Sequence, residues 1–128
     1  MINILGQVMV YVNNQDESVK FWTEKVGFVV ISEGDNGEGM RWIEIAPQEN
    51  SQTTIVLHNK EVIAKMGTGI NLETPSLLFF TEDIEKLYDK LSNNNVILGE
   101  IMTIPLGRTF NFADNEQNYF AVVEKNNK

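Results

Sequence analysis

Apolar positions in the first half of the chain follow the spacing of a strand and then that of a helix. Residues 6–12, GQVMVYV, are rich in β-branched and aromatic side chains, which favours a strand. Val19, Trp22 and Val26 then recur at i, i+3 and i+7, the spacing of one helix face. Gly27 follows directly, as a glycine often does where a helix ends. Three further strands are predicted after this helix, at residues 28–32, 40–46 and 53–58, and the three glycines at residues 34–39 predict a flexible turn between the first two.

The second half of the chain repeats this order of elements. Residues 76–80 are predicted to form a strand, and a helix with a regular apolar face is predicted to begin at Asp83. Three more strands are predicted at residues 96–98, 109–113 and 119–124. Because the order of elements is the same in both halves, the chain is predicted to contain a duplicated β-α-β-β-β unit.

This duplication predicts an α+β fold built from two βαβββ modules. We place module 1 at about residues 1–60, a linker at about 61–75 and module 2 at about 76–126, within a single domain spanning 1–128. The connection at residues 59–75 is expected to be a loop or a short helix. Two such modules are expected to place their sheets around a shared pseudo-twofold cleft.

Composition narrows the classes of function. The formal net charge is −8 and the ten Lys and Arg residues are scattered, so no nucleic-acid partner is predicted. The chain has no Cys, which excludes disulfides and thiol nucleophiles. The N-terminal residues lack the features of a signal peptide, and no apolar stretch is long enough to cross a bilayer. We therefore expect a cytoplasmic protein with no membrane partner.

Two motifs resemble those of the vicinal oxygen chelate superfamily, which contains glyoxalase I, bleomycin-resistance proteins and extradiol dioxygenases. Residues 18–28, SVKFWTEKVGF, look like its S-x-x-F-Y-x-x-x-L-G-F signature. Residues 112–119, FADNEQNY, are similar to its F-x-D-P-D-G-N hairpin, although Asn115 replaces the usual Pro and Gln117 the usual Gly. The resemblance covers almost the whole chain, and it implies the two-module fold and a homodimer.

The resemblance also implies where the metal ligands of the superfamily's enzymes would lie. The four ligand positions fall on Gln7, Val56, Ser76 and Val122. Valine has no lone pair to offer a metal ion, so no metal cofactor is predicted. The alternative is a displaced metal site around His58, the only histidine, together with Glu44 and Glu124.

Strand alternation defines the candidate ligand contacts of the predicted cleft. Side chains on the same face as the ligand positions are expected to be Gln7, Met9, Tyr11, Thr54, Val56, His58, Ser76, Leu78, Phe80, Phe120, Val122 and Glu124. Trp42 can stack on a flat or cationic ligand, and Arg108 can pair with an anionic one. The same pattern is typical of side chains that only fill a core, and this alternative stays open. The candidate ligand-binding residues are Gln7, Tyr11, Trp42, Val56, His58, Ser76, Arg108 and Val122.

Three functions are consistent with these observations. The first is metal-free binding of a small molecule, as in the bleomycin-resistance branch that the chain resembles. The net charge of −8 can attract a cationic ligand, and the alternative is that it only keeps the protein soluble. The second is a glyoxalase-like lyase or a dioxygenase, which needs either the displaced metal site near His58 or general acid–base catalysis by a carboxylate. The third is a partner-binding module, which would expose an apolar patch.

Overall fold

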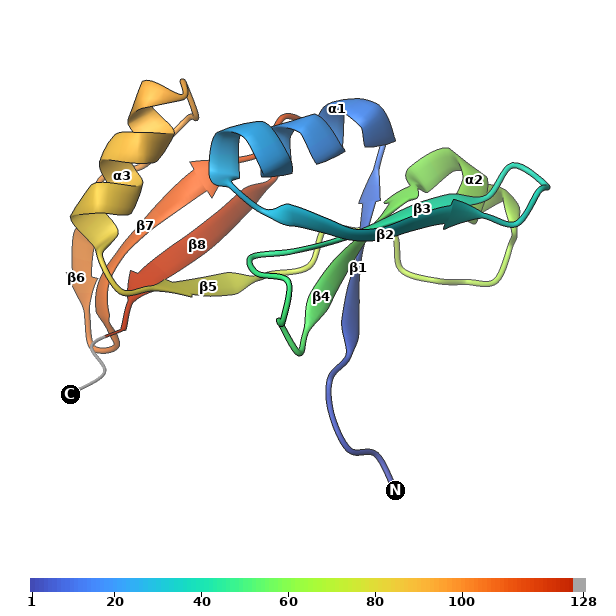
Figure 1. Cartoon of the computed structure of the whole chain (residues 1–128), viewed down its shortest axis with the longest axis horizontal. Coiled ribbons are helices and arrows are strands. Elements are labelled where there is room, and N and C mark those ends of the chain that lie inside the picture. Colours follow the sequence, from blue (N-terminus) through green and yellow to red (C-terminus); the bar gives the residue numbers. More distant parts are fainter. Residues whose placement is uncertain (126–128) are drawn as a thin grey trace. The chain divides into compact units, whose positions relative to one another are not determined.

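The fold consists of two compact units, Met1–Pro75 and Ser76–Lys128. The computed structural model describes residues 1–125, which form two four-stranded mixed sheets, one in each unit (Figure 1). Each sheet has one parallel pair of strands and two antiparallel pairs. The predicted α+β fold of two modules is confirmed. Among residues 1–125, no helix has the length and apolar character needed to cross a membrane.

The first sheet has the strand order β1-β4-β3-β2. Its strands are β1 (Gln7–Val12), β2 (Val29–Asp35), β3 (Arg41–Ala46) and β4 (Thr54–Asn59). Between β1 and β2, helix α1 (Gln15–Lys20) continues into the π-helical segment η1 (Phe21–Val26). The short helix α2 (Lys60–Lys65) follows β4, so the connection after module 1 contains a helix, which was one of the two expected forms.

Local chemistry sets the ends of the first helical segment. The Asn14 side chain accepts a hydrogen bond from the Glu17 backbone N–H at 3.0 Å, which satisfies one of the free donors of the first turn. At the other end Gly27 has a left-handed backbone with φ of 97°, as predicted for a helix-terminating glycine. The helix is tied to the sheet by Gln15, a buried side chain whose amide donates to the carbonyl oxygens of Arg41 and Leu57.

The core of the first unit lies on one face of its sheet. The fully buried side chains of this face are Val10, Val12, Ile43, Ile45 and Leu57. Trp22 of η1 is also buried, and α1 and η1 are in contact with strands of this sheet. Burial of these apolar side chains is the main stabilising contribution of the unit.

The second sheet has the strand order β5-β8-β7-β6. Its strands are β5 (Leu78–Thr81), β6 (Met102–Ile104), β7 (Gly107–Ala113) and β8 (Tyr119–Glu124). Helix α3 (Ile84–Asn93) begins after Asp83, whose side chain accepts from the Lys86 backbone N–H. The Tyr88 ring of α3 packs edge-on against Phe110 of β7, with centroids 5.1 Å apart, so α3 covers the face that carries Phe110.

The predicted strand at residues 96–98 is wrong. Val96 is buried and its N–H bonds to the Leu91 carbonyl oxygen, so this residue closes the end of α3. In this segment Leu98 forms only an isolated bridge with Phe112. The strand that pairs with β7 is β6, which the turn at residues 105–106 folds back onto it. Of these three apolar residues only Val96 is buried, whereas Ile97 is 57% exposed, so the apolar run did not mark a paired strand.

Candidate functional site

Strand register brings five of the candidate ligand-binding residues, Gln7, Tyr11, Trp42, Val56 and His58, to one face of the first sheet. Tyr11 pairs with His58, and His58 pairs with Trp42. Glu44 pairs with Val56 on the same face, opposite to the buried core. We call this surface the Glu44 face, and its residues are Gln7, Met9, Tyr11, Ser32, Trp42, Glu44, Thr54, Val56 and His58.

At the centre of this face is the Glu44 carboxylate, which three neutral side chains hold in place. Its oxygens accept hydrogen bonds from Thr54 Oγ1 at 2.7 Å, Ser32 Oγ at 2.9 Å and Gln7 Nε2 at 3.3 Å. These hydrogen bonds, first those from Thr54 and Ser32, lower the pKa of Glu44, because they stabilise the charged form. No cation among residues 1–125 forms an ion pair with it. A carboxylate can accept about four hydrogen bonds, so it has room for one more donor.

Aromatic side chains flank this carboxylate. The Tyr11 and His58 rings are stacked, with centroids 6.0 Å apart and planes at 25°. Trp42 lies next to His58 in register, and opposite Gly34 of β2. A Cβ at Gly34 would lie 2.6 Å from the Trp42 indole, so glycine leaves the space that the indole occupies. The predicted flexible turn at 34–39 is therefore wrong at its first residues, because Gly34 belongs to β2.

His58 has an incomplete set of hydrogen bonds. Its Nδ1 atom is buried and has no hydrogen-bond partner among residues 1–125. Burial lowers the pKa of His58, because the charged imidazolium is poorly solvated there, so the ring is neutral at pH 7. A neutral imidazole has one donor and one acceptor nitrogen, so one hydrogen-bonding atom of the ring is left unsatisfied within the fold.

The residues at the superfamily's metal positions do not fit a metal ion. Val56 of β4 is 3% exposed, pairs with Met9 of β1 and has no donor atom for a metal. No group of three or more His, Cys, Asp or Glu side chains that could hold a metal lies within residues 1–125. Glu124, which was predicted to join the displaced metal site, already has hydrogen-bond partners in the second unit. Its carboxylate accepts hydrogen bonds from the Arg108 guanidinium and from the Ile84 backbone N–H.

The predicted shared face of the second module is wrong. Leu78 and Phe80 were expected beside Val122, but β5 pairs Leu78 with Ala121 and Phe80 with Val123. Phe79 is the partner of Val122, which is 2% exposed and lies on the face that α3 covers. This register lets the Phe79 ring pack against the Phe112 and Phe120 rings, each at 6.3 Å.

The corrected register does not restore a metal site. Ser76 precedes β5 and is exposed, and the side chains that share a face with Leu78 and Phe80 are those of Ala121 and Val123. Neither alanine nor valine has a donor atom for a metal. Val122 is the fourth implied ligand position, and it is a core residue of the second sheet.

Arg108 was predicted as a contact for an anionic ligand, and it already has two carboxylate partners. Its guanidinium donates to Glu85 Oε1 of α3 at 2.8 Å and to Glu124 Oε1 of β8 at 2.9 and 3.2 Å. The hydrogen bonds to Glu85 and then Glu124 raise the pKa of Arg108, so it stays charged. In this arrangement Arg108 links β7 to α3 and β8.

Sequence reasoning missed Ser32 of the Glu44 face and Gly34, the glycine opposite Trp42. Ser32 was placed in a strand but given no role, and Gly34 was assigned to a turn. Both lie at even positions of β2, two residues apart, and strand alternation extended to Gly34 would have placed them on one face.

Comparison with known proteins shows the family. The model of the Glyoxalase/Bleomycin resistance protein/Dioxygenase superfamily matches residues 4–122, and the chain belongs to this superfamily. The uncharacterized protein YetH of Bacillus subtilis (strain 168) is 35% identical over 125 residues, which cover 97% of this chain and all of YetH.

Solved structures show the same fold. TnmS3, an antibiotic binding protein from Streptomyces sp. CB03234, has a TM-score of 0.80 at 24% identity, and the match covers 96% of each chain. A superfamily member from Sphaerobacter thermophilus DSM 20745 has a TM-score of 0.81 at 22% identity, with 97% of this chain and 98% of that chain covered.

Proposed function

We propose that this protein binds a small aromatic cation reversibly on the Glu44 face, without a metal ion. The observation that carries this proposal is the Glu44 carboxylate. It is kept ionised by Thr54 and Ser32, and no cation among residues 1–125 neutralises it. An ionised group without a counter-ion attracts a ligand of opposite charge.

The side chains around Glu44 support the aromatic part of the proposal. Tyr11, His58 and Trp42 lie side by side in register, and such rings bind flat or cationic groups through stacking and cation–π contacts. Val56 adds an apolar floor where the superfamily's metal enzymes carry a ligand.

The fold comparison is consistent with a binding role. TnmS3 is described as an antibiotic binding protein, and a binding function needs no metal ligands. We further propose, from the resemblance to the superfamily, that the protein acts as a homodimer in the cytoplasm and that residues 1–128 form a single domain. Multi-angle light scattering of the purified protein measures the oligomeric state, and a monomeric mass would contradict the dimer.

A charge-matched series of naphthalene probes tests the binding proposal. The probes are 2-naphthylmethylammonium, the neutral 2-naphthalenemethanol and the anionic 2-naphthoate. We expect calorimetry to show that the ammonium binds about fivefold more tightly than the alcohol, since a charge-assisted hydrogen bond at a partly exposed site contributes about 1 kcal/mol. The Glu44→Gln variant keeps the shape of the side chain and is expected to remove this preference.

The matched control is Glu24→Gln, which makes the same change of charge at an exposed position of η1. This control is expected to keep the preference for the ammonium. Equal affinities of the ammonium and the alcohol for the unmodified protein would refute the proposal. So would a Glu44→Gln variant that binds the ammonium as well as Glu24→Gln does.

A further inference from the structure

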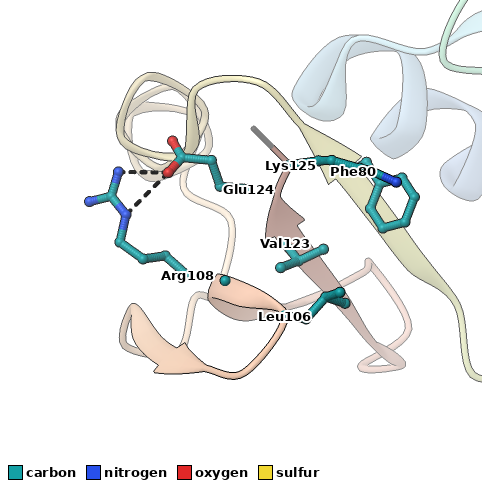
Figure 2. A pocket seen from close by; sticks show the side chains of 7 residues that line it. Phe80, Leu106, Arg108, Val123, Glu124 and Lys125 are labelled. Carbon is teal, nitrogen blue, oxygen red and sulfur yellow. Dashed lines mark hydrogen bonds and ion pairs between the residues drawn. The ribbon is translucent and has the colours of Figure 1, made fainter. Parts of the chain in front are cut away.

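The second unit contains an open hollow on the face of its sheet that α3 does not cover (Figure 2). Its volume is about 400 Å³, within the range of small-molecule sites. Val123 of β8 forms the floor and is 1% exposed, whereas Phe80 and Leu106 at the walls are 59% and 61% exposed. Apolar side chains exposed together in a hollow mark a binding surface more often than isolated ones do.

The wall formed by the β6–β7 turn has a fixed position. Gly107 follows this turn with φ of 144°, and a Cβ there would lie 2.9 Å from the Glu124 carbonyl oxygen. Only glycine allows the turn to approach β8 this closely without a shift of the backbone. The β6–β7 turn therefore packs closely against β8 at this side of the hollow.

Two basic side chains, Arg108 and Lys125, line this hollow. The Lys125 side chain lies over the Phe80 ring (Figure 2). Its ammonium is 4.7 Å from the ring centre, and no carboxylate among residues 1–125 forms an ion pair with it. Arg108, by contrast, is neutralised by Glu85 and Glu124. Lys125 is thus a cation beside an exposed aromatic ring, in a chain whose net charge is −8.

We propose that this hollow is a second binding site, which takes a small organic anion with a flat apolar body. The body of the ligand lies against Phe80 and Leu106 over Val123, and its carboxylate pairs with the Lys125 ammonium. Glu124 does not prevent this, because both of its oxygens are engaged, one by Arg108 and the other by the Ile84 backbone N–H. The site lies within the second unit and uses no residue of the Glu44 face.

The test is a titration of the full-length, ¹⁵N-labelled protein with 2-naphthoate, followed by NMR. We expect the amide signals of Phe80, Leu106, Gly107 and Val123 to shift with the largest amplitude. The neutral 2-naphthalenemethanol is expected to bind about fivefold more weakly at this site, the upper end of what an exposed ion pair contributes. Shifts that leave these four amides unchanged, or equal affinities of the two probes, would overturn the proposal.

Two variants separate the charge of Lys125 from a general loss of positive charge. Lys125→Met is expected to weaken 2-naphthoate about fivefold, while Lys86→Met, on the exposed side of α3, leaves the affinity unchanged. Glu44→Gln is also expected to leave it unchanged, which distinguishes this site from the one proposed above. A Lys125→Met variant that binds 2-naphthoate as well as Lys86→Met does would refute the site.

Discussion

The Gln15 side chain connects helix α1 to the sheet beneath the Glu44 face, and Gln15→Ala tests that connection. Its amide nitrogen donates to the Arg41 carbonyl oxygen at 2.7 Å and to the Leu57 carbonyl oxygen at 2.9 Å. The contact with Leu57 is buried and the contact with Arg41 is partly buried. Alanine removes both donors, and water does not reach the Leu57 carbonyl oxygen as readily as it reaches the Arg41 one.

The magnitude follows from these two contacts. A buried carbonyl left without a donor costs about 2 kcal/mol, and the partly buried one about 1 kcal/mol. Alanine loses less side-chain entropy on folding than glutamine and has a higher helix propensity. Together these two effects stabilise the folded variant by about 1 kcal/mol. The free energy of unfolding is therefore expected to fall by about 2 kcal/mol for Gln15→Ala.

Urea denaturation followed by tryptophan fluorescence measures this change. Both tryptophans, Trp22 and Trp42, lie in the first unit, so the signal reports on the unit that contains Gln15. The control is Gln52→Ala, an exposed position that is expected to change stability by less than about 0.5 kcal/mol. If Gln15→Ala changed the free energy of unfolding no more than this control, the proposed connection would be wrong.

Two further predictions concern Glu44 and metal ions. Because the folded protein lowers the pKa of Glu44 below 4.5, its stabilising contribution is fully present above that pH and is lost as the pH falls through the lower folded value. Urea denaturation at a series of pH values measures this contribution. At pH 7 the unmodified protein is expected to be more stable than Glu44→Gln, and this difference in the free energy of unfolding is expected to vanish in acid. A difference that does not change with pH would contradict the prediction. The second prediction concerns metal content, measured by mass spectrometry on protein that was exposed to Ni, Zn, Fe, Mn and Co and then dialysed. No stoichiometric metal is expected to remain. Retention of about one ion per chain, lost in His58→Ala, would instead support the enzyme hypothesis.

The first module could be predicted from the sequence to the level of individual side chains. Alternate side chains of a strand point to opposite faces of the sheet, so Tyr11, Val56 and His58 could be assigned to one face. Gly27 could be assigned to the end of a helix because a left-handed backbone favours glycine. The superfamily could be recognised because the motif at residues 18–28 is local and fairly specific.

The hydrogen bonds of Glu44 could not be predicted in the same way. The three donors Gln7, Ser32 and Thr54 lie on three different strands, and β1 and β4 are far apart in the sequence. Pairing of β1 with β4 and of β2 with β3 brings them to one carboxylate. Sequence reasoning considered Glu44 only as a metal ligand, whereas its neighbours make it an ionised group held by neutral donors.

In the second module the sequence determined the order of most elements but not which side chains face the core. Residues 77–80 are apolar at every position, so alternation carries no information about the faces of β5. In the observed register Val122 lies in the core and Phe80 lies on the open side of the sheet. The same register lets the Phe79 ring pack against Phe112 and Phe120. Local patterns thus determined the elements, and only the tertiary structure decided the register, because register depends on contacts between residues distant in the chain.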